Sequence, residues 1–291
     1  EHFLLNLPFY HIFGFGVLNI ALSSGATGVI MKSFDPQAYC RAIDTFKIRM
    51  IFLVPPILIF LTKHPMIASF NLKSIEYVIS GAAPAGRDIC EEFLSKHPNV
   101  KMLSQGYGMT ECGMASHLPN MSFKDVFVGV GSPGSMFEQK IIDVSTKKEV
   151  AIGERGEVCV RSPCLMTGYL NRPEATAETI DKEGWLHTGD IGFIDSEGRT
   201  YIVDRLKELI KVKGLQVPPA ELEDLLLSHP LVRDAAIIGL PDKKRGELVR
   251  AYVVRANDSL KEADVISFVA QKVSAYKQIT GGVVFVDEIP K

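Results

Sequence analysis

Between residues 36 and 104 the chain alternates amphipathic segments with apolar runs, and this alternation is the strongest constraint on its fold. Residues 36–46 and 56–63 fit helices, whereas residues 50–54 and 75–80 are short apolar runs typical of buried strands. Strands separated by helices predict βαβ units and a mostly parallel sheet. In such sheets ligands bind beyond the carboxyl ends of the strands, so the loops at those ends are the first candidates for a site.

Two loops directly follow predicted strands. The first, SGAAP at residues 80–84, has small residues that let the backbone approach a planar ligand, although any tight turn favours them too. The second, QGYGMTE at residues 105–111, places Tyr107 between glycines, with its ring free to stack on a base. Thr110 then offers a hydroxyl to phosphate, and Glu111 offers an oxygen to Mg²⁺. The combination is more specific than either loop alone.

After residue 129 the pattern changes to short alternating runs separated by glycine and aspartate turns, which predicts a β-barrel or a small antiparallel sheet. Within it lies WLHTGD at residues 185–190, where Asp190 could accept hydrogen bonds from two ribose hydroxyls or be an ordinary turn residue. Earlier in the chain, His11 lies among aromatic residues, and taken alone it fits a packed core histidine better than a catalytic one.

Residues 201–216 combine a strand-like start with six charged side chains and end near Gly214. Such a stretch suits binding of a polyanion, but it equally fits a solvated charged hairpin. Beyond it we expect helices at 220–227 and 262–273 and strands at 235–239, 249–254 and 283–286. These make an α+β unit of roughly 80 residues, enough for a small core of its own.

Length and composition narrow the class of protein. At 291 residues two domains are expected, and the net charge of −2 gives no general attraction to nucleic acid or anionic membrane. The apolar run at 50–61 is too short to span a bilayer. Five cysteines without a Cys-x-x-Cys pair predict reduced thiols of an intracellular protein, with neither a disulfide framework nor a metal site.

Taken together, these segments resemble the adenylate-forming superfamily, close to the acyl-CoA synthetases and 4-coumarate–CoA ligases. The resemblance covers essentially the whole chain and rests on motifs in the family's order: LPFYHIFGFG, SGAAP, QGYGMTE, GERGEVCVR, GYLNRPEAT, WLHTGDIG and YIVDRLKELIKVKGLQVPPAELE. It implies an α/β fold with a truncated large domain at 1–206, formed by mostly parallel sheet layers and a small β-barrel at about 129–206. A small, mobile α+β lid domain would follow at 207–291.

The resemblance also implies a two-step ligase reaction. A carboxylic acid attacks the α-phosphate of ATP, assisted by Mg²⁺, to give an acyl-adenylate and pyrophosphate, and CoA then displaces AMP to give a thioester. ATP, Mg²⁺, CoA and a carboxylic acid are therefore the expected cofactors and substrates, with no nucleic acid partner. The identity of the acid and the oligomeric state stay open. The compartment, cytoplasmic or peroxisomal, also stays open.

Roles follow residue by residue from the same resemblance. His11 would orient the carboxylate, Thr110 would contact phosphate, Glu111 would bind Mg²⁺ and Lys211 would serve thioester formation. Lys207 would be the hinge between the domains. The adenine and its surroundings would be bound by Gly81, Ala82, Ala83, Gln105, Gly106 and Tyr107, the ribose by Asp190 and Arg205, and CoA by Lys213, Gly214 and Gln216. The acyl pocket would be lined by Phe13, Gly14, Val17, Gly113, Met114 and Ala115, whose small members suggest room.

Three departures from the family pattern bear on these expectations. Ser33 replaces a lysine that related ligases often carry before the Phe34 position, which puts one CoA contact in doubt. The family's phosphate loop would precede the first residue, and Lys291 matches the lysine before the catalytic one. We therefore expect a fragment that adenylates poorly. Two alternatives stay open: a non-catalytic module that binds nucleotide or acyl-adenylate, and an enzyme of the same fold with a luciferase-like second step.

Overall fold

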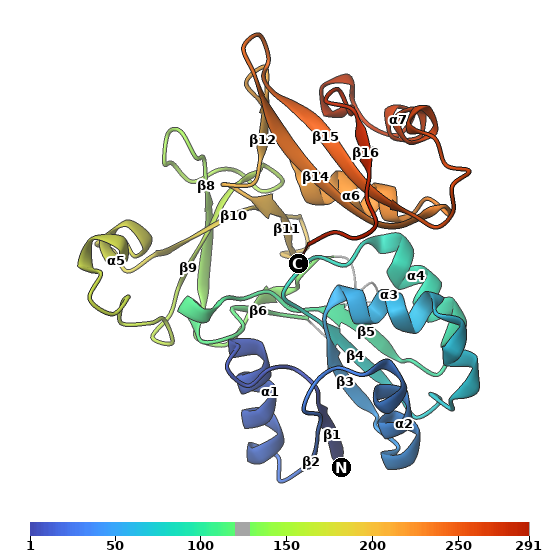
Figure 1. The fold of residues 1–291 in the computed structure, drawn as a ribbon. Coiled ribbons are helices and arrows are strands. Elements are labelled where there is room, and N and C mark those ends of the chain that lie inside the picture. The colour runs from blue at the N-terminus through green and yellow to red at the C-terminus, as the bar shows by residue number, and fades with distance from the viewer. Residues whose placement is uncertain (120–128, 291) are drawn as a thin grey trace. The chain divides into compact units, whose positions relative to one another are not determined.

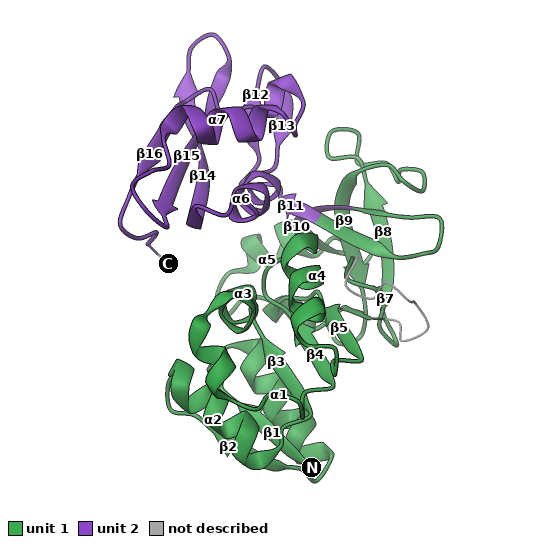
Figure 2. Ribbon diagram, turned by 90° about the vertical axis from the view of Figure 1, so that its right-hand side faces the viewer, with its two compact units in different colours: residues 1–188, 193–202 green, residues 189–192, 203–291 purple. Residues whose placement is uncertain are grey.

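The computed structural model describes residues 1–119 and 129–290, so Lys291 lies outside the described residues. The chain divides into two compact units (Figure 2). Unit 1 comprises residues 1–188 and 193–202, and unit 2 comprises residues 189–192 and 203–291. The family-based boundary at residue 206 stays a prediction.

Unit 1 begins with parallel strands and helices in alternation, as the sequence predicts (Figure 1). A three-stranded parallel sheet has the order β3-β4-β5, and β1 pairs with β2 in a separate parallel pair. The strands are β1 (His2–Leu5), β2 (Thr27–Ile30), β3 (Met50–Leu53), β4 (Tyr77–Ser80) and β5 (Met102–Gln105). The helices are α1 (Ile12–Ser23), α2 (Pro36–Phe46), α3 (Pro55–Lys63) and α4 (Arg87–Lys96), with a 3₁₀ turn η1 (Pro65–Ser69).

Local sequence explains where these elements begin and end. Helix α2 starts at Asp35, whose carboxylate accepts a hydrogen bond from the Ala38 amide at 2.7 Å, and Pro36 occupies its first turn. It ends where Lys47 adopts a left-handed conformation. The apolar face of α2 joins the fully buried residues of β3, α3 and α4 in the largest hydrophobic core of unit 1.

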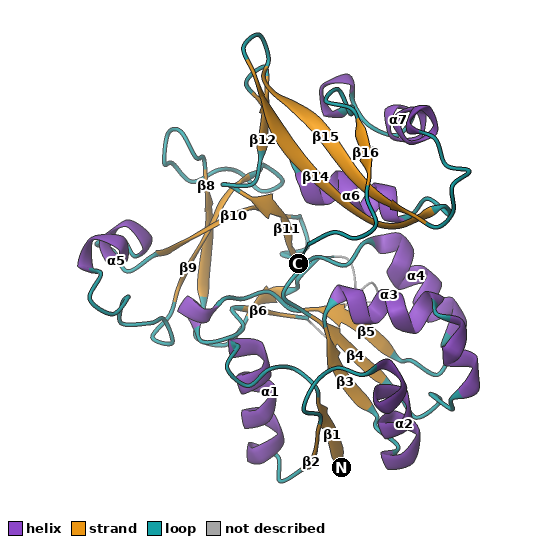
Figure 3. Cartoon of the chain, in the orientation of Figure 1, coloured by secondary structure: helices purple, strands orange, loops and turns teal. Residues whose placement is uncertain are grey.

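The second part of unit 1 is built on an antiparallel sheet with the strand order β11-β10-β9-β8 (Figure 3). Among the described residues this sheet does not close into a barrel, so the barrel expectation is wrong and its alternative, a small antiparallel sheet, is confirmed. Strands β10 and β11 contribute residues to both units, since residues 189–192 of β10 and 203–205 of β11 belong to unit 2. The elements here are η2 (Thr110–Cys112), β6 (His117–Leu118), β7 (Ser132–Pro133), β8 (Glu138–Ile142), β9 (Gly156–Arg161), α5 (Pro173–Thr179), β10 (Leu186–Ile194) and β11 (Thr200–Arg205).

Unit 2 is an α+β unit around the long antiparallel pair of β14 and β15. Its sheet has the order β13-β12-β15-β14, and β16 pairs with β15 in parallel. Apolar residues of α6 and α7 join the strands in a core of their own, as expected for a unit of this size. The elements are β12 (Ile210–Val212), β13 (Leu215–Val217), α6 (Pro219–Leu227), β14 (Val232–Asp242), β15 (Gly246–Arg255), α7 (Glu262–Ala270), η3 (Ala275–Lys277) and β16 (Val283–Phe285).

The longest apolar helix, α1, has 12 residues. Within the described ranges, none of the helices has both the length and the hydropathy needed to cross a bilayer.

Candidate active site

The carboxyl ends of β3, β4 and β5 meet at one edge of the parallel sheet, because Leu53 is in register with Ser80 and Ser80 with Gln105. The hydrogen-bonded ladder continues one step into the loops: the Gly81 amide donates to Leu53 at 3.1 Å, and the Gly106 amide donates to Ser80 at 2.9 Å. The two predicted nucleotide loops therefore start side by side, where parallel sheets bind ligands.

The buried side chain of Gln105 joins these loops. Its Oε1 accepts from the Ala85 amide at 2.8 Å, and its Nε2 donates to the Ala85 carbonyl at 3.1 Å. Ala82 has a φ of +70°, in the left-handed region that residues with a Cβ rarely adopt, so this loop needs outside support. Gln105 thus positions the backbone of the first loop.

The glycines on either side of Tyr107 have different functions. A Cβ at Gly106 would have nothing closer than the His117 carbonyl oxygen at 3.8 Å, whereas a Cβ at Gly108 would overlap the carbonyl of Met114. The Tyr107 ring is half-buried and lies 5.5 Å from the His117 ring, centroid to centroid. The ring is therefore packed on an aromatic neighbour, and its stacking on a base stays a prediction.

His117 is a site residue that the sequence reasoning missed. It is fully buried, and its Nε2 lies 2.7 Å from Gln139 Oε1 while its Nδ1 lies 3.0 Å from the Ser116 hydroxyl. Burial lowers the pKa of this imidazole, against the opposing effect of the Gln139 hydrogen bond. The ring is thus held neutral behind Tyr107. A histidine six residues after GMTE carries no signal of this in the sequence.

Glu111, the predicted Mg²⁺ ligand, accepts a hydrogen bond from the Tyr169 hydroxyl at 2.6 Å on Oε1. The Glu111 carbonyl also accepts from the Met166 amide at 2.8 Å. The hydrogen bond to Glu111 raises the pKa of Tyr169, so the phenol stays protonated as the donor. Thr110 is exposed in the same 3₁₀ turn. The sequence placed Tyr169 only within the family motif GYLNRPEAT, and its contact with Glu111 was missed.

His11 is exposed and caps the first turn of α1, because its Nδ1 accepts from the Phe13 amide at 3.1 Å. The interpretation of His11 as a packed core residue is therefore wrong. A neutral ring that accepts at Nδ1 carries its proton on Nε2, which leaves a donor for another partner.

The predicted acyl-pocket residues come together only in part. Val17 is buried in a small apolar cluster, and Phe13 and Met114 pack against it. The Phe13 ring also covers Gly81, where a Cβ would lie 3.1 Å from it. Gly14 adds no free space, since a Cβ there would overlap the Pro8 carbonyl. Gly113 has a φ of +75° and is exposed, and Ala115 is half-buried beside Met114.

In unit 2, Asp190 lies within strand β10, so its alternative interpretation as a turn residue is wrong. Its Oδ1 lies 3.7 Å from Nε of Arg205, the other predicted ribose contact, whose side chain is 68% exposed. The neighbouring Asp204 is buried and accepts hydrogen bonds from the Arg205 and Ala220 amides, at 2.7 and 3.1 Å. Burial raises the pKa of Asp204. This carboxylate therefore ties the end of β11 to the start of α6.

The basic stretch ends in a tight hairpin of β12 and β13. Lys211 pairs with Gln216 across it, and its two turn residues, Lys213 and Gly214, have φ values of +50° and +80°. Two successive positive φ angles are typical of the type I′ turn of two-residue hairpins. Lys211, Lys213, Gly214 and Gln216 are all exposed, as is Lys207. A solvated charged hairpin is therefore confirmed as the local structure, and the hinge and CoA roles stay predictions.

In comparisons with known proteins, two segments of the chain match models of the same enzyme family. The AMP-binding enzyme family matches residues 1–170, and the AMP-binding enzyme C-terminal domain matches residues 221–291. Among similar curated proteins, 4-coumarate–CoA ligase 2 of Nicotiana tabacum is 45% identical over 291 residues, covering 98% of this chain and 53% of the relative. Luciferin 4-monooxygenase of Luciola mingrelica is 42% identical over 287 residues, covering 98% of this chain and 52% of the relative.

Solved structures show the same fold. ATP-bound MatB from Rhodopseudomonas palustris aligns with a TM-score of 0.90 at 28% identity, covering 100% of this chain and 57% of that one. The o-succinylbenzoate CoA synthetase of Bacillus subtilis, in complex with its acyl-adenylate intermediate, aligns with a TM-score of 0.86 at 29% identity, covering 100% and 58%. The chain spans about half the length of the curated relatives it matches. On these matches, which extend over both units, the chain belongs to the AMP-binding enzyme family.

Proposed function

We propose that the protein to which this chain belongs is an ATP-dependent acyl-CoA ligase. It would join a carboxylic acid to AMP with release of pyrophosphate, and then transfer the acyl group to CoA with release of AMP. The observation that carries this proposal is the pair of loops at the carboxyl edge of β4 and β5, fixed to each other by Gln105. Similarity to 4-coumarate–CoA ligases supports CoA as the acyl acceptor.

The two loops would bind the nucleotide by shape and backbone. Gly81, Ala82 and Ala83 offer a small-residue edge along the adenine, with Gly106 and Tyr107 on the other side. Thr110 is exposed at the next turn, where its hydroxyl can reach a phosphate oxygen. These contacts position the α-phosphate for attack, which is the main task of a protein in such chemistry.

The residues present fit a Mg²⁺ ion at Glu111. The Tyr169 hydroxyl holds one carboxylate oxygen at 2.6 Å, so the side chain is oriented and has a second oxygen to offer. Mg²⁺ in phosphoryl-transfer sites commonly takes one or two protein carboxylates together with phosphate oxygens and water. When bound, the ion would neutralise charge that develops on the phosphates.

His11 would serve the acid substrate. Its Nδ1 is occupied by the α1 cap, so the neutral ring can donate from Nε2 to a carboxylate oxygen. Phe13, Val17 and Met114 would supply the apolar wall of the acyl site. In unit 2 we propose that Asp190 and Arg205 contact the ribose and that Lys207 acts as the hinge. Lys211, Lys213, Gly214 and Gln216 would serve the CoA step.

The test uses the complete protein and a panel of carboxylic acids, from cinnamate-like to medium- and long-chain acids. We expect pyrophosphate release that requires both ATP and one class of acid, followed by thioester formation when CoA is added. Absence of acid-dependent pyrophosphate release across the panel would contradict the proposal and favour the non-catalytic binding module.

A second candidate is a luciferase-like oxidation of the acyl-adenylate, favoured by the 42% identity to Luciola mingrelica luciferin 4-monooxygenase. The same reactions separate the two candidates. Consumption of oxygen with light emission from an adenylated luciferin-type acid, without thioester formation, would favour oxidation over ligation.

A further inference from the structure

Strand β9 carries two kinds of side chain on its two faces. Val158 and Val160 point into an apolar cluster with Leu186 of β10, whereas Glu157 and Cys159 alternate with them on the opposite face. That opposite face is polar, yet Cys159 is fully buried there and Glu157 is only 4% exposed. A buried carboxylate beside a buried thiol is costly unless both have partners.

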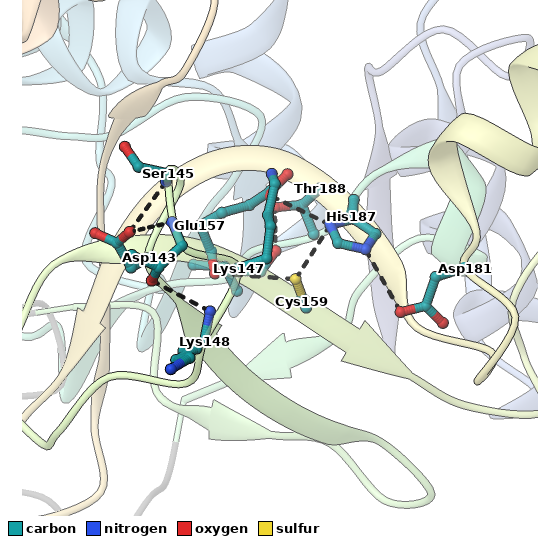
Figure 4. Close-up of polar contacts among 11 residues, drawn as sticks. Asp143, Ser145, Lys147, Lys148, Glu157, Cys159, Asp181, His187 and Thr188 are labelled. Carbon is teal, nitrogen blue, oxygen red and sulfur yellow. Dashed lines mark hydrogen bonds and ion pairs between the residues drawn. The ribbon is translucent and has the colours of Figure 1, made fainter.

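His187 of β10 places a third potential metal ligand beside Glu157 and Cys159 (Figure 4). Its Nδ1 lies 3.6 Å from Cys159 Sγ and 3.2 Å from Glu157 Oε2, and the three atoms all lie within 4.8 Å of one another. Zinc bonds of about 2.0–2.3 Å at tetrahedral angles separate neighbouring ligand atoms by roughly 3.4–3.6 Å. The separations from nitrogen to sulfur and from nitrogen to oxygen are therefore close to those around one tetrahedral ion, and the third lies within 4.8 Å.

The surroundings supply what such a site needs beyond its ligands. Asp181 Oδ2 lies 3.6 Å from His187 Nε2, just beyond hydrogen-bond distance, on the side where a carboxylate commonly orients a metal-binding histidine. The buried residues Trp185 and Ile142 pack against Cys159. The His187 side chain is 23% exposed, which leaves a route from solvent. Lys147 Nζ lies 3.6 Å from Glu157 Oε2 and balances its charge when no ion is bound.

We propose that Glu157, Cys159 and His187 form a binding site for Zn²⁺, with water as the fourth ligand. Zn²⁺ takes thiolate, imidazole and carboxylate together, whereas Mg²⁺ prefers oxygen ligands in octahedral geometry. The sequence predicted no metal site because its cysteines lack Cys-x-x-Cys spacing. Here a single cysteine combines with a glutamate two residues earlier and a histidine on the adjacent strand. The proposal does not depend on the ligase activity.

The test is titration of the tag-free 291-residue chain with Co²⁺, a spectroscopic substitute for Zn²⁺. We expect one equivalent to bind and to give the thiolate-to-cobalt charge-transfer absorption of a Co–S bond. One equivalent of Zn²⁺ should remove that absorption, and a large excess of Mg²⁺ should not. Lack of a stoichiometric Co–S signal in the folded wild-type chain would overturn the proposal and leave a hydrogen-bonded triad only.

Variants locate the site. Cys159→Ser should abolish the charge-transfer band. His187→Gln removes a ligand, so it should weaken Co²⁺ binding by more than about 100-fold, which is the upper limit for substitutions of residues that only orient a ligand. Asp181→Asn should weaken it by roughly 10-fold, since only the orientation of the histidine changes. Circular dichroism of each metal-free variant checks that it folds.

Cys164→Ser is the matched control, because Cys164 is the exposed thiol of the chain's five cysteines. Its removal should leave the band and the affinity unchanged. A band lost in Cys164→Ser but kept in Cys159→Ser would assign the signal to a surface thiol and refute the site.

Discussion

The two proposed sites of unit 1 differ in what they would offer a ligand. At the carboxyl edge of the parallel sheet the proposed nucleotide site would offer backbone and small residues, such as Ala82 and Ala83, which are exposed. On the polar face of β9 the proposed metal site would offer side chains that are themselves buried, such as Cys159. The loop of the first site is held in place by hydrogen bonds from the buried Gln105 to Ala85. The side chains of the second site come together because they lie on adjacent strands, β9 and β10. In this molecule the conformation of an exposed loop is thus fixed by a buried side chain.

The largest expected effect comes from disrupting the close contact between Gly108 and the Met114 carbonyl in the second loop. Gly108→Ala places a Cβ on the Met114 carbonyl, and backbone cannot yield as a side chain can. We expect the free energy of unfolding to fall by about 3 kcal/mol. Chemical denaturation measures it.

Gly106→Ala is the control on the other side of Tyr107, where the nearest atom would be 3.8 Å away. Its stability should change by less than about 1 kcal/mol. Equal losses in both variants would show that the loop needs glycine at each position for conformational reasons, and not for the contact with Met114.

The next largest effect is expected when the hydrogen bonds between Gln105 and the first loop are removed. Gln105→Leu removes the partner of the buried Ala85 amide, at 2.8 Å, and the partner of its carbonyl at 3.1 Å, which keeps only the long 4.0 Å contact with Cys90 Sγ. Each such group costs about 1–3 kcal/mol, and relaxation of the loop reduces the sum, so we expect a loss of ~2 kcal/mol. In the complete protein, ATP binding should weaken as well. Gln37→Leu, an exposed glutamine on α2, should change neither quantity, and a Gln105→Leu variant with unchanged ATP affinity would separate the loop from the nucleotide.

A smaller effect concerns the orientation of Glu111. Tyr169→Phe removes the 2.6 Å hydrogen bond to Oε1, together with the hydroxyl's side-chain contact with Thr179. We expect kcat/KM for adenylation by the complete protein to fall roughly tenfold, since a hydrogen bond to a charged group at a partly exposed site is worth about 1.5 kcal/mol. Tyr252→Phe, a half-buried tyrosine in unit 2, is the control. A rate unchanged by Tyr169→Phe, at any Mg²⁺ concentration, would mean that Glu111 needs no such orientation.

The same contrast explains what the sequence could predict. The loops at 80–84 and 105–111 were identified because small residues after apolar runs are a local pattern, and their residues adjoin in the structure. Tyr169 reaches Glu111 across 58 positions, and His187 reaches Cys159 across 28, so no local spacing reveals either contact. The antiparallel sheet was anticipated from its alternating runs, but barrel closure depends on which edge strands pair, and that too is non-local.

The smallest effect tests His117, which links the second loop to the antiparallel sheet. Its backbone pairs with Tyr107 in the loop, and its ring reaches Gln139 on β8, which also accepts from the Thr200 hydroxyl at 2.9 Å. Burial lowers the pKa of His117, so below the ordinary histidine value of about 6.5 the unfolded chain binds a proton that the folded chain resists. Stability should therefore be complete above that pH and decrease as the pH falls toward the folded-state pKa. In His117→Gln this part of the decrease should disappear, while the part from His97, whose pKa burial also lowers, should remain. Denaturation at pH 7.5 and at pH 5.5, compared between wild type, His117→Gln and His97→Gln, isolates the contribution. If His117→Gln loses stability as steeply with acid as the wild type, the link is a packing contact and its neutral ring plays no part in holding Tyr107.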